Sequence, residues 1–257
     1  MKKKLILFIT IIIVAVMALV GVAYVASKNL SEQPHTEDTT EVEHGQGNYT
    51  IEEVPINIEE IAPNPHRSIQ FSENIPEAVR VSLNEKAAVS AKILDEDITR
   101  ADEWFNLGVY YHTANDFEGA KEVWEFLAIV LPENAVVLDN LGKLHHYSLR
   151  EFTSAEVYFK QSIERDPTSL TPYLELHELY KYSYKTGTTA AVDIINQAIN
   201  KFPDVIGLYT TLGTYHRDRG EVAQARAAFT TGLNLARDMN DVDLIATFGR
   251  ELERLPQ

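Results

Sequence analysis

The sequence predicts an all-α fold: an α-solenoid of four helix pairs with N- and C-terminal capping helices, preceded by a single transmembrane helix. Three observations lead to this prediction. A pattern of large aromatic and small residues recurs four times between residues 101 and 237. An apolar stripe follows the last copy, and a long apolar stretch opens the chain. Because one helix pair of this kind cannot bury its apolar face alone, neighbouring copies are expected to stack.

The N-terminal stretch is predicted to anchor the chain in a membrane. Three lysines come first, and Leu5 to Ala26 is then uninterrupted apolar or small. A membrane span needs about 20 apolar residues, whereas the apolar region of a cleaved signal has about 7 to 15. Residues 1–30 are therefore interpreted as an uncleaved signal anchor, with cleavage after Ala23 as the alternative. The position of the lysines predicts a single-pass membrane protein whose N-terminus is cytoplasmic and whose repeat domain is extracytoplasmic.

Residues 31–70 are predicted to form an acidic, disordered tether. No Lys or Arg occurs between Lys28 and Arg67, while acidic residues recur throughout. Such a segment has little to bury and repels itself into extended conformations. Its second half also carries β-branched and aromatic residues that allow an alternative role as a docking peptide: Tyr49, Ile51, Val54, Ile56, Ile58 and Ile61.

Composition and missing motifs exclude several functions. A net charge of -15 argues against nucleic acid and against anionic membrane surfaces as partners. The chain has no cysteine, which excludes disulfides, a thiol nucleophile and a Cys-based metal site. No glycine-rich phosphate-binding loop, nucleophile elbow or H-E-x-x-H motif occurs. We therefore expect neither enzyme activity nor a cofactor.

The repeat domain is predicted to span residues 71–257, and its first repeat, about 101–134, is the clearest. Its pattern residues are Trp104, Leu107, Gly108, Tyr111, Ala120, Trp124 and Pro132. They fit the spacing W-x2-L-G-x2-Y, A-x3-F, P, with a Trp in place of the Phe. In this respect the chain resembles the tetratricopeptide repeat (TPR) family. The resemblance implies two antiparallel helices, A and B, in each repeat and a right-handed solenoid.

Three further repeats are expected at about 135–169, 170–205 and 206–237, followed by an end helix at 240–255. The turn between helices A and B carries extra residues near Arg150 in the second repeat and around 185–189 in the third. Thr153 and Glu156 are expected to form a capping box. His177 replaces the helix A glycine of the third repeat, which predicts looser packing there.

The TPR resemblance also implies a binding surface, because family members bind peptides or protein surfaces along a concave groove lined by helix A. Carried over position by position, the partner-binding residues are Phe105, Val109, His112, Asn140, Lys143, His146, Tyr147, Glu178, Lys181, Tyr182, Thr214 and Arg217. Some members hold a C-terminal carboxylate with a Lys and an Asn of the first repeat. Phe105 and Val109 occupy those positions, so that clamp is not expected here.

The cations of this surface suggest the chemistry of the partner. Lys143, Lys181 and Arg217 come from successive repeats and suit an acidic extended peptide, including the chain's own acidic tether. Alternatively, they pair with nearby carboxylates and contribute little: Asp139, Glu178 and Asp218. Several histidines fall in helix A segments, but without a local H-x3-H pair or a carboxylate cluster they do not predict a metal site.

The function predicted from these features is a non-enzymatic, membrane-anchored scaffold that binds a protein or peptide through the helix A groove. One alternative is a structural subunit of an envelope, secretion or pilus machine that uses the convex face and the ends of the array. Another is a carbohydrate-binding accessory element, for which the aromatic groove residues are the only support.

Overall fold

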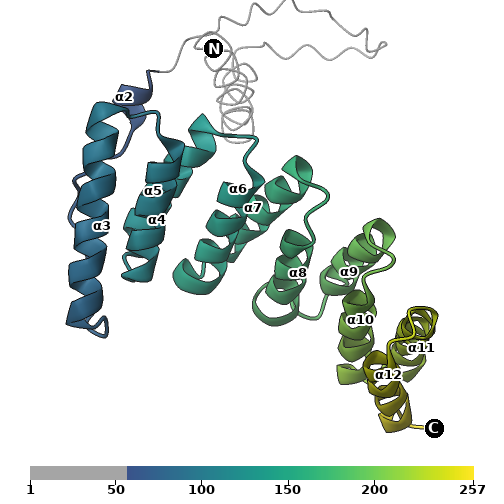
Figure 1. The fold of residues 1–257 in the computed structure, drawn as a ribbon. Coiled ribbons are helices and arrows are strands. Elements are labelled where there is room, and N and C mark those ends of the chain that lie inside the picture. The colour runs from purple at the N-terminus through teal and green to yellow at the C-terminus, as the bar shows by residue number, and fades with distance from the viewer. Residues whose placement is uncertain (1–56) are drawn as a thin grey trace, which may run out of the picture. The chain divides into compact units, whose positions relative to one another are not determined.

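The computed structural model describes residues 57–257, and every regular element in this range is helical (Figure 1). The chain divides into two compact units, of which the first ends at Glu133 and the second runs from Asn134 to Gln257. The described part of the first unit contains α2 (Ile58–Ile61), α3 (Glu77–Glu96), α4 (Ala101–Thr113) and α5 (Phe117–Val130). Here α4 and α5 are helices A and B of the first repeat, and α3 packs on α4.

The second unit contains three A and B pairs and an end helix. Helix A of the second and third repeats ends in a π-helical segment, labelled η. The elements are α6 (Ala135–Lys143), η1 (Leu144–Leu149), α7 (Phe152–Arg165), α8 (Thr171–Glu178), η2 (Leu179–Ser183), α9 (Ala190–Lys201), α10 (Ile206–Asp218), α11 (Val222–Asp238) and α12 (Val242–Arg254). Asn134 caps α6 by accepting from the amides of Val136 and Val137, and Asp241 caps α12.

In the first, second and fourth repeats, the two helices approach closely because a glycine of helix A faces an aromatic ring of helix B. A Cβ placed on Gly142 would lie 2.5 Å from Phe159 Cδ1, and one on Gly213 would lie 2.3 Å from Phe229 Cε1. These rings are fully buried. The small residue and the large ring therefore fill one close-packed contact, which the recurring sequence pattern encodes.

The third repeat has the residue sizes exchanged at these two positions. His177 stands at the glycine position, and Ile195 stands where the other repeats have an aromatic ring. Both side chains are buried, and His177 Nδ1 donates to the carbonyl of Ala191 at 2.9 Å. Burial lowers the pKa of His177, so the imidazole stays neutral. The helices α8 and α9 approach each other over fewer residues than the A and B helices of the other repeats, in agreement with the looser packing expected for this repeat.

The extra residues of repeats two and three widen the end of helix A. In the first repeat, the bond that closes the turn joins Asp116 N to Tyr111 O at 2.9 Å. In the second repeat, the corresponding bond joins Glu151 N to His145 O at 2.8 Å and encloses one more residue. Arg150 then reverses the chain with a left-handed φ of 59°. The insertion thus extends the helix as η1, and η2 ends helix A of the third repeat in the same form.

The predicted capping box at α7 is wrong. The helix begins at Phe152, with Glu151 at the N-cap position and no side-chain cap bond. Glu156 lies in the second turn, and its carboxylate accepts from Lys160, Tyr180 and Lys185 instead. Thr153 and Glu156 have the spacing of a capping box but do not cap this helix, because the helix starts before Thr153.

In the first unit, the segment before α3 packs against the turn between α4 and α5. Arg67 forms a bidentate ion pair with Asp116, with distances of 2.6 and 3.1 Å. The same carboxylate accepts from the amides of Gln70 and Gly119, and Tyr111 donates its hydroxyl proton to the carbonyl of Arg67. Several residues of the sequence-predicted tether thus contact the first repeat; the tether upstream of residue 57 lies outside the described residues.

The expected transmembrane helix and single-pass membrane location are corrected here. Within residues 57–257, no helix is both long and apolar enough to cross a membrane. The stretch from Leu5 to Ala26, on which the expectation depended, lies outside the described residues. The fold class that the structure supports is the all-α repeat array alone.

Trp124 provides a test of the helix contact in the first unit. Its ring is buried against Gly108, and its indole Nε1 has no hydrogen-bond partner among the described residues. Changing Trp124 to Phe removes this unpaired donor, which costs about 1 to 3 kcal/mol when buried, but leaves a cavity of similar cost. We expect the free energy of unfolding, measured by urea denaturation, to change by less than about 1 kcal/mol. A loss of about 3 kcal/mol or more would contradict this account.

Candidate functional site

The predicted partner-binding residues fall in both units. Phe105, Val109 and His112 lie on α4 of the first unit, and the others lie on helices A of the second. In the first unit, Trp124 lies near Phe105 and His112. Its ring centroid is 6.3 Å from that of Phe105 and 5.7 Å from that of His112. Val109 is exposed. This part of the surface is apolar and aromatic.

We use the name helix A surface for the side of the second unit's A helices, including η1 and η2, that carries the predicted binding residues Asn140, Lys143, His146, Tyr147, Glu178, Lys181, Tyr182, Thr214 and Arg217. Within this surface, Lys143 is already paired with carboxylates of the chain. Its Nζ lies 2.7 Å from Asp139 Oδ2 and 3.8 Å from Glu175 Oε1. Asn140 donates to the carbonyl of Val136 at 2.9 Å, so its amide is directed to its own helix.

Tyr147 and His146 lie side by side in η1, and only the tyrosine is accessible. His146 is buried, its Nε2 lies 2.9 Å from Ser183 Oγ, and its ring stacks on that of Tyr147 at 4.0 Å. Tyr147 is 59% exposed and donates its hydroxyl proton to Glu175 Oε2 at 2.7 Å. Partial burial and the neighbouring carboxylates raise the pKa of Tyr147, so the hydroxyl remains a donor.

The third and fourth repeats continue this surface. Lys181 Nζ lies 3.9 Å from Asp218 Oδ2 and 4.8 Å from the ring centroid of Tyr182, which is 64% exposed. Arg217 pairs with Asp218 at 3.0 Å and also with Glu251 of α12. Thr214 is half-buried and lies on α10, one helical turn before Arg217.

All three predicted cations of the surface are thus engaged by carboxylates of the chain. The partners include Asp139 and Asp218, which the sequence offered as the alternative to an acidic ligand. Glu178 is the third expected partner and differs from the other two, because its carboxylate makes no hydrogen bond or ion pair within the described residues. The surface therefore has no surplus of positive charge for an acidic peptide.

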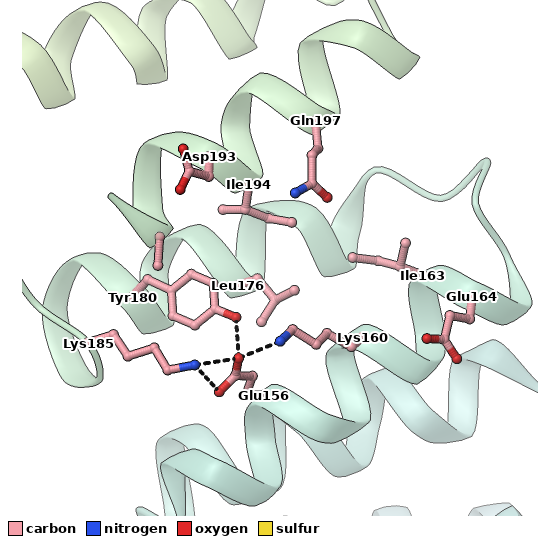
Figure 2. A pocket seen from close by; sticks show the side chains of 11 residues that line it. Glu156, Lys160, Ile163, Glu164, Leu176, Tyr180, Lys185, Asp193, Ile194 and Gln197 are labelled. Carbon is pink, nitrogen blue, oxygen red and sulfur yellow. Dashed lines mark hydrogen bonds and ion pairs between the residues drawn. The ribbon is translucent and has the colours of Figure 1, made fainter. Parts of the chain in front are cut away.

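A second feature, which sequence reasoning missed, is a pocket of about 430 Å³ between α7, α8 and α9 (Figure 2). Its apolar lining includes Ile163, Leu176 and Ile194. At one end, the buried carboxylate of Glu156 lies 2.6 Å from Lys160 Nζ and 2.7 Å from Lys185 Nζ.

Tyr180 completes the cluster by donating its hydroxyl proton to Glu156 Oε1 at 2.8 Å. Burial by itself would raise the pKa of Glu156, but the hydrogen bonds from Lys160, Lys185 and Tyr180 outweigh it and lower the pKa to about 2. In the sequence, only the spacing of four residues between Glu156 and Lys160 indicated a part of this cluster. Lys185 reaches it from the insertion after η2, at a left-handed φ of 57°.

The structure offers no metal centre in the part of the chain that it describes. Between residues 57 and 257, no group of three or more His, Asp or Glu side chains is arranged to hold an ion. His145 and His216 instead contact the start of helix B, where Nδ1 of each lies close to a glutamate, at 2.8 Å from Glu151 and 2.5 Å from Glu221.

The helix pairs are similar to those of solved repeat proteins. The crystal structure of MamA matches with a TM-score of 0.50 and 17% sequence identity, over 66% of this chain and 99% of that chain. MamA is a TPR-type protein. The fold is TPR-like.

Yeast Tom70, also TPR-type, matches more weakly, with a TM-score of 0.37 and 12% identity over 70% of this chain. The chain spans half the length of the Tom70 structure. No family model and no curated protein matches the sequence. The match to MamA confirms the TPR-like, all-α fold predicted from the glycine and aromatic pattern, and it assigns no partner.

Proposed function

We propose that this chain is a non-enzymatic protein-interaction module that binds a polypeptide partner on the helix A surface of its second unit. One observation carries the proposal. Among all Trp, Tyr and Phe residues between 57 and 257, only Tyr147 and Tyr182 are exposed. They occupy the same position in successive repeats, five residues after Gly142 and His177.

Both tyrosines are held in place before any partner binds. The hydroxyl of Tyr147 is fixed by Glu175, and the ammonium of Lys181 lies over the ring of Tyr182. Both lie in the π-helical segments η1 and η2, a geometry that recurs at functional sites. Large, fixed aromatic side chains lose little entropy on binding and are enriched at interaction hot spots.

The proposal is tested by photo-crosslinking in cells that produce the full chain. A photoreactive amino acid replaces Tyr147 or Tyr182, and a matched control replaces Val157, which is exposed on α7 of the same unit. We expect the same polypeptide to be crosslinked from both tyrosine positions and not from the control. Adducts from position 157 alone would place the partner on the B helices and favour an assembly subunit. An absence of polypeptide adducts at 147 and 182, with the protein folded, would contradict the proposal.

A further inference from the structure

We propose that the segment bound at Tyr147 and Tyr182 is a basic one, in which a Lys or Arg side chain lies against the two rings and pairs with Glu178. This inference rests on the proposed function and names the chemistry of its partner. It reverses the acidic partner that the sequence offered as one of two alternatives, because the structure pairs the cations of this surface with carboxylates of the chain.

The charges around Tyr147 favour a cation. Its hydroxyl donates to Glu175 Oε2 at 2.7 Å, and the charges of Glu175, Glu178 and Asp139 all contribute to raising its pKa. Lys143 is the cation paired with two of them. Lys181, the next cation along the surface, lies 3.9 Å from Asp218 of the fourth repeat and 4.8 Å from the ring centroid of Tyr182, and it makes no ion pair with Glu178. The carboxylate of Glu178 therefore remains for a ligand.

The geometry of helix A places that carboxylate beside the aromatic rings. Glu178 follows Glu175 by one helical turn, and Glu175 accepts from Tyr147. Tyr182 follows Glu178 by one further turn, in η2. A guanidinium or ammonium group between these side chains gains cation–π attraction from an exposed ring and an ion pair with Glu178.

The chain's own tether does not match this surface. Residues 31–62 contain no Lys or Arg and many carboxylates, so the surface carboxylates would repel it. Outside residues 2–4 the chain has no Lys/Arg-rich run, so a second copy offers little basic sequence. The occupant we infer is therefore an extended Lys/Arg-bearing segment of a different protein.

The test uses three fluorescent peptides, each with four Gly-Ser-X units in which X is Arg, Gln or Glu. Their binding to the full chain is measured by fluorescence anisotropy at low ionic strength. We expect the Arg peptide to bind about tenfold more tightly than the Gln peptide and the Glu peptide to bind most weakly. Glu178→Gln and Tyr182→Ala should each weaken binding of the Arg peptide about threefold to fivefold.

A matched control separates this site from the general attraction of a basic peptide to a chain of net charge -15. Glu164→Gln removes the same charge from an exposed position on α7 and should leave binding unchanged within about 1.5-fold. Equal losses in Glu164→Gln and Glu178→Gln, or tighter binding of the Glu peptide, would overturn the inference.

The inference and the proposed function fail in different ways. A crosslinked partner whose contacted segment, mapped by mass spectrometry, lacks Lys and Arg would overturn the basic ligand and leave the interaction surface in place. Adducts between two copies of the chain would also exclude a basic segment of a different protein. The absence of any polypeptide adduct at Tyr147 and Tyr182 would instead contradict the proposed function, whatever the binding of the fluorescent peptides.

Discussion

Replacing Gly213 by alanine is expected to lower the free energy of unfolding by about 2 kcal/mol. The new methyl group would lie 2.3 to 2.8 Å from three carbons of the Phe229 ring. That ring is fully buried and packs 6.4 Å from Phe248, centroid to centroid, so it has no space into which to move. The overpacking exceeds the gain of about 1 kcal/mol that alanine brings to a helix interior.

Gly249 is the matched control for this substitution. It lies in the interior of α12 in the same unit, and a Cβ there meets nothing within 4 Å. Gly249→Ala should therefore raise the free energy of unfolding by about 0.5 to 1 kcal/mol. Urea denaturation followed by far-UV circular dichroism measures both variants. If the two changes have the same sign, the close contact between Gly213 and Phe229 does not determine the stability of this pair.

Glu156→Gln is expected to destabilise the second unit by about 2 kcal/mol at pH 7. The pKa of Glu156 is about 2 in the folded protein, against an ordinary value of 4.5. A lowered folded pKa stabilises the fold above about pH 4.5, and this contribution disappears as the pH falls towards 2. The side chains of Lys160 and Lys185 are 55% and 40% exposed, so solvent screens part of their pairing with Glu156. The expected loss of stability is therefore smaller than the difference between the two pKa values alone would give.

The difference between wild type and Glu156→Gln should therefore narrow by about half between pH 7 and pH 3. Urea midpoints of both proteins at several pH values give this difference directly. Glu164→Gln, on the same helix and exposed, is expected to show no difference at any pH. A Glu156→Gln difference that stays constant down to pH 3 would show that the carboxylate contributes through packing and not through its charge.

Sequence reasoning was sufficient for the helix pairs because their close contact depends on residue size. Gly142 and Phe159 are at family spacing, and the structure brings them together as predicted. The same argument from residue size predicts the weaker approach of α8 and α9, because His177 stands at the glycine position of the third repeat.

The charges of the helix A surface were less predictable, for a physical reason. The cation of Lys143 is visible in the sequence, but its contact with Glu175 joins two repeats and depends on how they stack. The cluster at Glu156 likewise needs Lys185, which the insertion brings back over the preceding repeat. Neither contact has a fixed sequence spacing, so counting charges could predict neither.

The contact between Arg67 and Asp116 has a consequence for where the first unit can be shortened. A chain that began at residue 71, the boundary suggested by the helical pattern, would lose the guanidinium and the Gln70 amide that bind Asp116. This carboxylate also caps α5 and is almost completely buried. Truncation would therefore leave a buried charge without its counter-ion at the start of a core helix, so a stable fragment has to begin before Arg67.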